Sequence, residues 1–366
     1  MSVAALMRGS TIGIIGGGQL GRMLAMAAAR LGYRCVILDP DPDCPAAQVA
    51  SRQIVGDFGD LDALESLASS CHLITYEFEN VPVGGVTRLS RSVTVYPPAR
   101  ALEVSQDRVA EKTFVNGLGI RTAEFRPVDT DAELADALSA FSGRGVLKTR
   151  RFGYDGKGQR VFRGQGEAVT GIVEAMGGGD LILESLVPFE REISIIAARD
   201  PQGAIVCYEP AENEHRNGIL ARSTVPAHVR SETVAAARAA AEAIMAGLDY
   251  VGVIGIEFFV LPGGELLVNE IAPRVHNSGH WTEALCAVSQ FENHIRAICG
   301  LPLGSPERHS DGVMENLVGE EVERARALLD MPRAVLHLYG KAKIRPGRKM
   351  GHVTHLTGSA KSGKAV

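Results

Sequence analysis

The chain has 366 residues, of which 45% are hydrophobic and 22% charged, as in folded proteins with two or three domains. Its net charge of −5 argues against a general nucleic-acid-binding protein, which needs a basic surface. The six cysteines form no Cys-x-x-Cys pair, and no apolar run is long enough to span a bilayer. We therefore expect a cytoplasmic protein, and neither a disulfide scaffold nor a cysteine zinc site is indicated. The charge does not exclude a small anionic ligand held by a local cluster of Arg and Lys.

The first hundred residues alternate strand and helix patterns. Predicted strands lie at 11–15, 34–38 and 72–76, and predicted helices at 19–31 and 60–69. This order predicts a small parallel sheet covered by helices. The pair Pro97 and Pro98 marks its end.

Two further regions and a short appendage follow. The second region has a predicted helix at 131–141 and predicted strands at 145–149, 181–183 and 192–198. The third has an alanine-rich helix at 232–246 and two long strands that flank the turn at 262–264. From about residue 312 the pattern predicts a small, mostly β unit.

A glycine loop follows the first predicted strand. Gly16, Gly18 and Gly21 fit G-x-G-x-x-G before a helix, and Asp39 closes the next strand, as in dinucleotide-binding domains. The physical content of the motif is narrower, because glycines and a helix N-terminus suit any phosphate group. A glycine turn that serves packing alone is the structural alternative.

Two predicted strands each carry one glutamate inside an apolar run, Glu257 in the first and Glu270 in the second. A Pro-Gly-Gly-Glu turn signal lies between them. A hairpin centred between Gly263 and Gly264 pairs the two glutamates directly.

Facing carboxylates in apolar surroundings repel each other unless a cation lies between them. We therefore predict that Glu257 and Glu270 bind a metal ion, and oxygen ligands favour Mg²⁺. Asn269 points to the other face of a regular strand, unless a bulge turns it toward the site. The alternative is a structural pair with one carboxyl group protonated or paired with an arginine.

A second glycine-rich segment, residues 150–159 (RRFGYDGKGQ), carries three glycines and three cations. It is not a Walker A loop, because no Ser or Thr follows Lys157. Its composition suits a lid over a triphosphate. Lys148 ends the strand before it and is placed to reach phosphate oxygens. An exposed basic hairpin is the structural alternative.

Five segments together resemble the ATP-grasp superfamily and, more closely, the 5-(carboxyamino)imidazole ribonucleotide synthases. They are 16–23 (GGGQLGRM), 76–82 (YEFENVP), 153–159 (GYDGKGQ), 269–282 (NEIAPRVHNSGHWT) and 345–352 (RPGRKMGH). The similarity spans nearly the whole chain in the right order. The PRVHNSGHWT run is specific to this family, whereas the first glycine loop and the paired acids are not.

The resemblance implies an α/β and α+β architecture, the ATP-grasp fold. An N-terminal Rossmann-like, parallel-sheet domain comes first, and a small, mostly β domain ends the chain. The predicted division is 1–110 for the first domain, 111–200 for the subdomain with the glycine-rich lid, 201–311 for the subdomain with the metal site and 312–366 for the last domain.

The resemblance also implies site residues. At ATP it places Arg108, Lys148, Gly153, Tyr154, Asp155, Gly156, Lys157, Gly158, Gln159, Glu184, Ser185, Leu186, Val187, Glu192, His215, Asn269 and Glu270. At 5-aminoimidazole ribonucleotide it places Gly18, Gln19, Glu79, Tyr154, Asp155, Arg274, His276, Asn277, Ser278, Lys341 and Arg348. It makes Glu257 and Glu270 the metal ligands, in agreement with the hairpin argument. The candidate catalytic residues are Asp155, Lys148, Arg274 and His276.

The implied reaction carboxylates the amine of 5-aminoimidazole ribonucleotide with bicarbonate and ATP, through carboxyphosphate, in purine biosynthesis. Mg²⁺ or Mn²⁺ would neutralise phosphate charge, and the lid would keep water from carboxyphosphate. Asp155 would orient the amine or accept its proton, while Arg274 and His276 would hold anionic oxygens. The expected enzyme is a cytoplasmic homodimer that uses no biotin and binds neither nucleic acid nor membrane.

Two other functions stay open on sequence grounds. Another ATP-grasp ligase, such as a biotin carboxylase-like enzyme, would keep Glu257, Glu270 and the lid but would not need residues 274–282. The chain has no Met-Lys-Met biotin-acceptor motif. An NAD-dependent oxidoreductase would rest on the first glycine loop and Asp39, and it leaves the paired acids unexplained.

Overall fold

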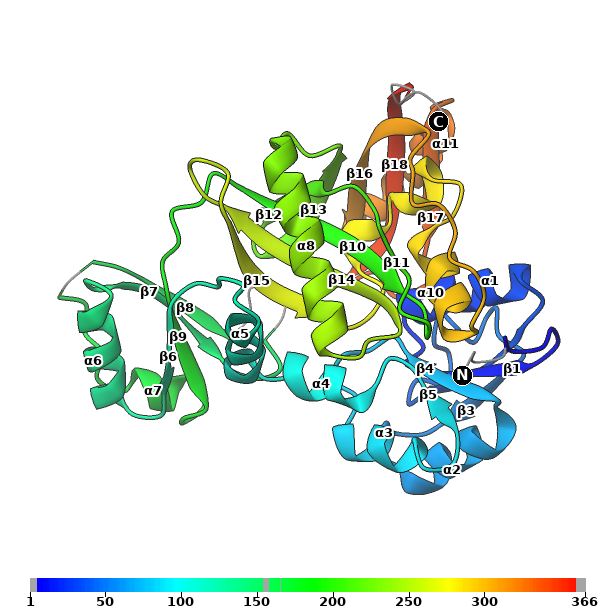
Figure 1. Ribbon diagram of the computed structural model, residues 1–366, viewed down its shortest axis with the longest axis horizontal. Helices are drawn as coiled ribbons and strands as arrows, with labels where there is room; N and C mark the ends of the chain where they lie inside the picture. Colours follow the sequence, from blue (N-terminus) through cyan, green and yellow to red (C-terminus); the bar gives the residue numbers. More distant parts are fainter. Residues whose placement is uncertain (1–4, 154–157, 165, 360–366) are drawn as a thin grey trace.

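The computed structural model describes residues 5–153, 158–164 and 166–359. In Figure 1 a large sheet lies in the middle of the molecule, a small sheet forms the lobe on the left, and a parallel sheet lies at the lower right. Among the described residues, no helix is long and apolar enough to cross a membrane.

The N-terminal sheet has five parallel strands in the order β3-β2-β1-β4-β5. Helices cover it, so its central strands are apolar along their length. The strands are β1 (Thr11–Ile15), β2 (Arg34–Asp39), β3 (Arg52–Val55), β4 (Leu73–Tyr76) and β5 (Thr94–Val95). The helices of this region are α1 (Gln19–Arg30), α2 (Leu61–Ser70) and α3 (Val83–Leu89), followed by α4 (Ala99–Ser105) and α5 (Arg108–Gly117).

The small sheet is antiparallel, with the order β6-β9-β7-β8. Its strands are β6 (Phe125–Val128), β7 (Arg144–Thr149), β8 (Gln159–Arg163) and β9 (Leu181–Ser185), and its helices are α6 (Asp131–Ala140) and α7 (Ile172–Ala175). Helix α6 begins with a capping box, in which Thr130 and Glu133 exchange hydrogen bonds with each other's backbone.

The large sheet has nine strands. Eight follow the order β15-β14-β10-β12-β13-β16-β18-β17, and β11 pairs with β10. The strands are β10 (Arg191–Arg199), β11 (Ile205–Cys207), β12 (Ala211–Arg216), β13 (Ile219–Val225), β14 (Gly252–Val260), β15 (Leu266–Ala272), β16 (Ser310–Val318), β17 (Ala334–Leu338) and β18 (Lys349–Ser359). Its helices are α8 (Ser231–Gly247), η1 (Asn277–Gly279), α9 (Thr282–Leu285), α10 (Gln290–Ile298), η2 (Gly319–Arg324) and α11 (Ala325–Leu329).

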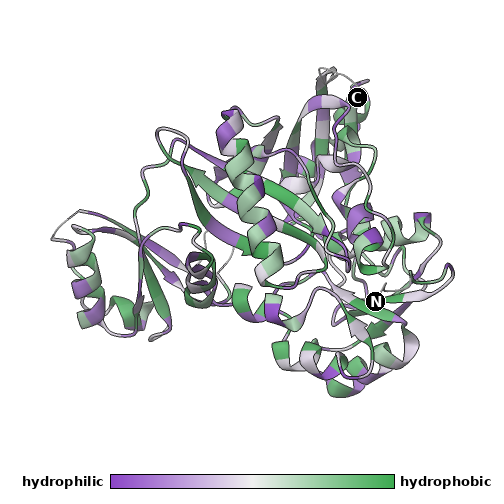
Figure 2. Ribbon diagram, in the orientation of Figure 1, coloured by the Kyte–Doolittle hydropathy of each residue, from purple (hydrophilic) through white to green (hydrophobic). Residues whose placement is uncertain are grey.

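Strand β10 explains how the large sheet holds the molecule together. Alternate residues of a strand point to opposite faces, and both faces of β10 are buried, so it reads as a continuous apolar run. Ile193 and Ile195 pack in one core with α8, whereas Ile196 and Ala198 belong to the core shared with α1 and α10. In Figure 2 the central strands β10 and β14 are largely hydrophobic in colour.

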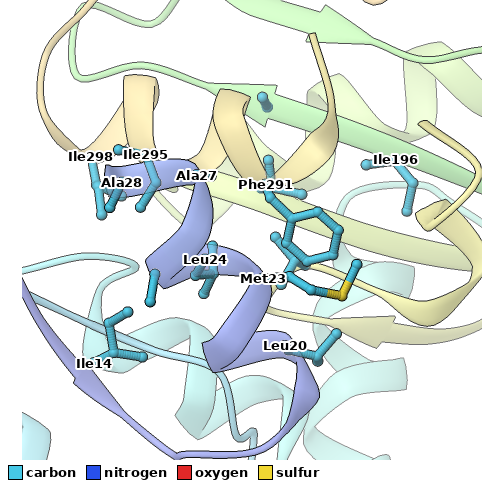
Figure 3. Close-up of a cluster of buried hydrophobic side chains, with 14 of the residues drawn as sticks. Ile14, Leu20, Met23, Leu24, Ala27, Ala28, Ile196, Phe291, Ile295 and Ile298 are labelled. Atoms are coloured by element: carbon cyan, nitrogen blue, oxygen red, sulfur yellow. The ribbon is translucent and has the colours of Figure 1, made fainter. Parts of the chain in front are cut away.

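The N-terminal sheet is joined to the large sheet through helix α1. Figure 3 shows Leu24 of α1 between Ile14 of β1 and the α10 side chains Phe291 and Ile295, with Ile196 of β10 nearby. All five side chains are almost fully buried. Because one apolar cluster joins β1 and α1 to the distant elements β10 and α10, the first glycine loop is held in a fixed position beside the large sheet.

The strands and helices predicted in the first two regions are confirmed, with ends that differ by one or two residues. The last part of the chain forms β-structure as predicted, and β16 pairs with β13 so that it continues the large sheet. The domain borders stay a prediction.

Candidate active site

A cavity of about 440 Å³ lies where the three sheets meet. Strands β7 and β8 of the small sheet, β14 and β15 of the large sheet, helix α5 and the loop after β4 contribute to its walls. Predicted site residues that line it are Gln19, Glu79, Arg108, Lys148, Gly153, Gly158, Gln159, Glu192, His215, Glu257, Asn269, Glu270, Arg274, His276 and Asn277. Predicted residues that do not line it are Gly18, Glu184, Ser185, Leu186, Val187, Ser278, Lys341 and Arg348.

Glu257 and Glu270 pair directly across β14 and β15, as the sequence predicted. The strand register that brings them together differs from the regular hairpin that the sequence predicted. Nearer the turn, Val260 pairs with Leu266 and Phe258 with Val268, a register that would place Glu257 opposite Asn269. A β-bulge at Asn269 shifts the register by one residue and brings Glu270 opposite Glu257.

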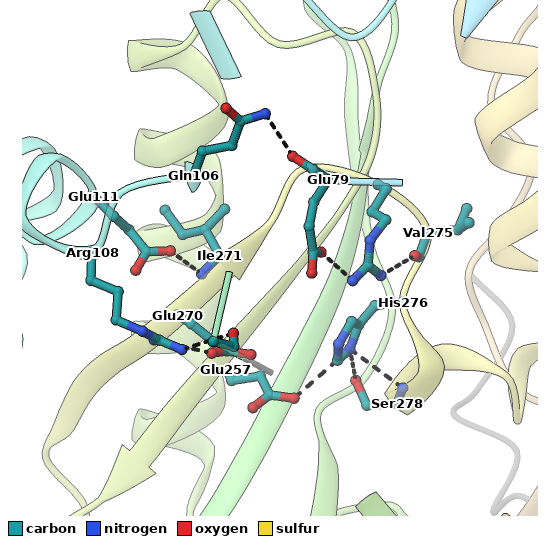
Figure 4. Close-up of polar contacts among 12 residues, drawn as sticks. Glu79, Gln106, Arg108, Glu111, Glu257, Glu270, Ile271, Val275, His276 and Ser278 are labelled. Carbon is teal, nitrogen blue, oxygen red and sulfur yellow. Dashed lines mark hydrogen bonds and ion pairs between the residues drawn. The ribbon is translucent and has the colours of Figure 1, made fainter. Parts of the chain in front are cut away.

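The two carboxyl groups of this pair have different electrostatic surroundings. Burial first, and then the neighbouring Glu270, raises the pKa of Glu257 to about 8. Glu270 lies 3.5 Å from a guanidinium nitrogen of Arg108, and Arg108 with Lys148 outweighs the effect of burial and lowers the pKa of Glu270 (Figure 4). Without a bound cation, Glu270 is therefore ionised, whereas Glu257 tends to stay protonated.

His215 and Glu192 lie beside the acid pair. His215 Nδ1 lies 2.9 Å from Glu192 Oε2, and donor atoms of Glu192, His215 and Glu257 lie within 4.8 Å of one another. Burial opposes the charge of His215, but the contact with Glu192 and the nearby Glu257 outweigh it and raise the pKa of the imidazole. Glu192, His215 and Glu257 can therefore hold a cation, and Glu270 lies directly opposite Glu257.

Two residues that the sequence analysis missed position the bulge. Glu111 accepts a hydrogen bond from the backbone N–H of Ile271 at 2.6 Å, as Figure 4 shows. Lys112 donates to the backbone carbonyl of Asn269 at 3.3 Å. Neighbours on helix α5 thus hold the backbone on both sides of Glu270. Asn269 Oδ1 is buried without a hydrogen-bond partner among the described residues, which suits a further oxygen ligand for a cation.

A second buried carboxylate, Glu184 of β9, has cations on two sides. Its Oε2 lies 2.9 Å from Lys148 Nζ and 3.4 Å from Lys112 Nζ. Burial alone would raise the pKa of Glu184, but Lys148, Lys112 and Arg108 outweigh it and hold the value at about 2. Lys148 is thereby fixed at the cavity wall, where it can meet a phosphate group.

The second glycine-rich segment lies partly outside the described residues. Tyr154, Asp155, Gly156 and Lys157 are the predicted site residues to which this applies. On the described side, Arg108 lies 3.5 Å from the carbonyl oxygen of Gly153.

The segment after β15 forms a second group of polar side chains in the cavity. Arg274 pairs with Glu79 of the N-terminal region and donates to the carbonyl of Val275 at 3.0 Å (Figure 4). Asn277 is buried, and neither polar atom of its side chain has a partner among the described residues. Such a side chain at a cavity wall is suited to hydrogen-bond a ligand.

His276 is held tightly and stays neutral. Its Nδ1 lies 2.8 Å from Ser278 Oγ and 3.8 Å from Glu257 Oε1. Burial, with smaller effects from Arg274 and other cations, lowers its pKa well below the ordinary value. Space for the ring comes from Gly255 of β14, where a Cβ would lie 2.6 Å from His276 Cβ. A neutral imidazole can donate or accept a hydrogen bond but carries no charge for an anion.

The first glycine loop is occupied by the protein's own carboxylates. Gly17 N donates to Asp39 Oδ2 and Gly18 N to Glu77 Oε1, both at 2.6 Å. A Cβ on Gly18 would lie 2.8 Å from Glu77 Oε1, so glycine is required here for close packing. Two carboxylates on these amides disfavour a dinucleotide pyrophosphate, which needs the same donors.

Three protein-family models match consecutive parts of the chain. They are the ribonucleotide synthetase preATP-grasp domain at residues 9–106, the ATP-grasp domain at 113–291 and the phosphoribosylaminoimidazole carboxylase C-terminal domain at 312–365. The N5-carboxyaminoimidazole ribonucleotide synthase of Brucella melitensis is 58% identical over 97% of this chain and 99% of its own length. This chain belongs to the N5-carboxyaminoimidazole ribonucleotide synthase family.

Solved structures agree with that assignment. The Thermus thermophilus synthetase has a TM-score of 0.89 and 48% identity, covering 94% of this chain and 93% of its own. The Aspergillus clavatus synthase, in complex with ADP and 5-aminoimidazole ribonucleotide, has a TM-score of 0.90 and 31% identity and covers 96% and 95%. The predicted ATP-grasp fold is confirmed, and an oxidoreductase is wrong for this chain.

In this member of the synthase family, the sequence analysis missed Lys349, Glu111 and Lys112. Lys349 and Glu111 line the cavity, and Lys112 is almost fully buried. Lys349 lies within the family segment 345–352, so the sequence did contain a signal for it. Glu111 and Lys112 occupy buried positions of helix α5, and helical spacing alone does not distinguish them from exposed charged residues.

Proposed function

We propose that this chain carboxylates the amine of 5-aminoimidazole ribonucleotide with bicarbonate at the expense of ATP, giving 5-(carboxyamino)imidazole ribonucleotide, ADP and phosphate. It would serve purine biosynthesis. The observation that carries the proposal is that one cavity contains both the opposed acids Glu257 and Glu270 and the polar segment from Arg274 to Asn277. A similar solved synthase was obtained with ADP and this aminoimidazole nucleotide together.

The acid pair would hold Mg²⁺ or Mn²⁺. Three oxygen-bearing side chains meet there, namely Glu257, Glu270 and Asn269, whose Oδ1 lacks a partner among the described residues. The raised pKa of Glu257 fits a site that is incomplete without a cation. When bound, the ion would neutralise charge on the phosphate oxygens of ATP.

The chain's own cations would complete the nucleotide side. Lys148 is anchored by Glu184 and Arg108 by Glu270. Because both side chains are already held in place, binding the triphosphate would cost less side-chain conformational entropy than it would with free side chains. A bicarbonate oxygen would attack the γ-phosphorus while the bond to ADP breaks, forming carboxyphosphate. Residues 153–159 would cover this labile compound and exclude water.

The second step would take place beside Arg274. The amine nitrogen would bond to the carboxyl carbon of carboxyphosphate, or to CO₂ released from it, with phosphate as the leaving group and loss of one proton from nitrogen. Arg274 would hold an anionic oxygen. The neutral His276 and the amide of Asn277, which has no partner among the described residues, would supply hydrogen bonds. We assign the orientation of the amine to Asp155, and binding of the nucleotide to Gln19 and the more distant Lys341 and Arg348.

We further propose a cytoplasmic homodimer. Support comes from the edge strand β17 and the adjacent α11 region, where Leu329, Met331, Val335 and Leu338 are exposed. Exposed apolar residues along a sheet edge favour association. Light scattering at several protein concentrations would give the mass.

The function is tested by phosphate release from ATP, Mg²⁺ and bicarbonate, with and without 5-aminoimidazole ribonucleotide. We expect strong stimulation by the nucleotide in the wild type and a loss of about 100-fold or more in Glu270→Ala. Glu265→Ala is the matched control, because Glu265 lies in the same hairpin but is exposed and paired with Arg121. Turnover that ignores the nucleotide would reject this substrate while leaving ATP-dependent chemistry in place.

A further inference from the structure

Away from the cavity residues described above, two histidines face each other on the hairpin formed by β17 and β18. His337 and His352 are direct cross-strand partners, and their rings stack with centroids 5.3 Å apart. Side chains that oppose each other on antiparallel strands come close enough to share a ligand. Neither histidine has a role in the proposed reaction.

A carboxylate from another part of the chain completes this group. Glu283 of α9 places Oε2 at 3.2 Å from His337 Nδ1 and 4.0 Å from His352 Nε2. Donor atoms of the three residues lie within 4.8 Å of one another. Metal–ligand bonds of about 2.0–2.2 Å to nitrogen and oxygen require donors roughly 3.3 Å apart, so small side-chain rotations would suffice.

The surroundings prepare His352 as a ligand. Its Nδ1 lies 2.9 Å from the hydroxyl of Tyr339. In the tautomer that carries its proton on Nδ1, the ring donates to Tyr339 and directs the Nε2 lone pair toward Glu283, as in many metal sites. Burial, together with His337, lowers the pKa of His352 well below the ordinary value, so the imidazole is neutral and able to bind a metal.

We propose that Glu283, His337 and His352 form a binding site for a divalent transition metal of the Zn²⁺ type, with a water molecule as the fourth ligand. Two imidazoles and one carboxylate are a ligand set for Zn²⁺ rather than Mg²⁺. Because Glu283 lies on α9 and both histidines lie on the C-terminal hairpin, the ion fixes that hairpin against the ATP-grasp region. The site is separate from the acid pair and does not depend on the proposed reaction.

The experiment measures Zn²⁺ binding to metal-free protein in a large excess of Mg²⁺, by dialysis and elemental analysis, with thermal unfolding in parallel. We expect one Zn²⁺ per wild-type chain and a higher melting temperature when it is bound. Glu283→Gln and His337→Gln should each weaken binding at least about tenfold, and Tyr339→Phe by about tenfold through the lost orientation of His352.

His355→Gln is the matched control. His355 lies on the same strand, and its Nε2 lies 4.0 Å from Glu315, so its loss should leave Zn²⁺ binding unchanged. Circular dichroism checks that each variant folds. Because the Glu283 side chain is 27% exposed, we expect Glu283→Gln to fold, so that weaker Zn²⁺ binding in this variant reports on the site. The site would be refuted by a wild type that binds no Zn²⁺ under these conditions, by equal binding in Glu283→Gln, or by binding that depends on His215 instead.

Discussion

Two buried glutamates on neighbouring parts of the molecule differ sharply in their surroundings. Glu184 on the small sheet lies between Lys148 and Lys112, and its pKa is held at about 2. Glu257 on the large sheet faces Glu270, and burial together with this neighbour raises its pKa to about 8. The fold supplies Glu184 with its cations, whereas Glu257 requires one from outside. The contrast indicates which carboxylate stabilises the protein and which binds a ligand.

The largest expected effect comes from removing the charge of Glu184. Glu184→Gln leaves Lys112, whose side chain is 1% exposed, and Lys148 without their shared anion. We expect the free energy of unfolding to fall by about 3–5 kcal/mol, because an unpaired buried charge remains. Urea denaturation followed by circular dichroism measures this change.

The control for that substitution is Glu265→Gln. Glu265 pairs with Arg121 at 2.8 Å, but both side chains are mostly exposed. We expect a loss of less than about 1 kcal/mol, as for other exposed ion pairs. Equal losses of unfolding free energy in the two variants would show that Lys112 and Lys148 pair with other acids or become neutral when Glu184 is replaced.

Metal affinity sharpens the other half of the comparison. A metal ion must displace the proton of Glu257, whose pKa lies at about 8. Below pH 8 we expect the apparent Mn²⁺ affinity to fall by about tenfold for each pH unit. Electron paramagnetic resonance of free Mn²⁺ measures the affinity.

Glu257→Gln provides the comparison for that titration. Its binding should be weaker and should vary much less between pH 6 and 8, because the titrating carboxyl group is gone. A wild type whose Mn²⁺ affinity does not change with pH would place the ion elsewhere, for example wholly on Glu270 and Asn269.

The sequence predicted the acid pair because both glutamates interrupt apolar runs at similar distances from a turn. It left open whether a bulge turns Asn269 toward the site, because the bulge is held by contacts with Glu111 and Lys112 of a distant helix. Long-range pairing of this kind leaves no local pattern.

Long strands buried on both faces were predicted, whereas several short or polar strands were missed. Strand β10 reads as an apolar run, whereas β12, with the sequence AENEHR, does not resemble one. His215 lies on β12, so its place beside Glu192 followed only from the family resemblance and not from a predicted strand. The pairing of β13 with β16 joins segments about ninety residues apart, a contact that no local pattern shows.

The smallest effect concerns the stability of the metal-free protein. The folded chain raises the pKa of Glu257 from 4.5 to about 8, so it holds that proton more tightly than the unfolded chain does. This contribution to stability is fully present below the unfolded value and is lost as pH rises through about 8. Between pH 7 and 9 the wild type should therefore lose about 1 kcal/mol more than Glu257→Gln. Urea denaturation in the presence of a chelator measures both, and equal slopes would mean that Glu257 ionises without cost, so that the two glutamates would not differ as the structure indicates.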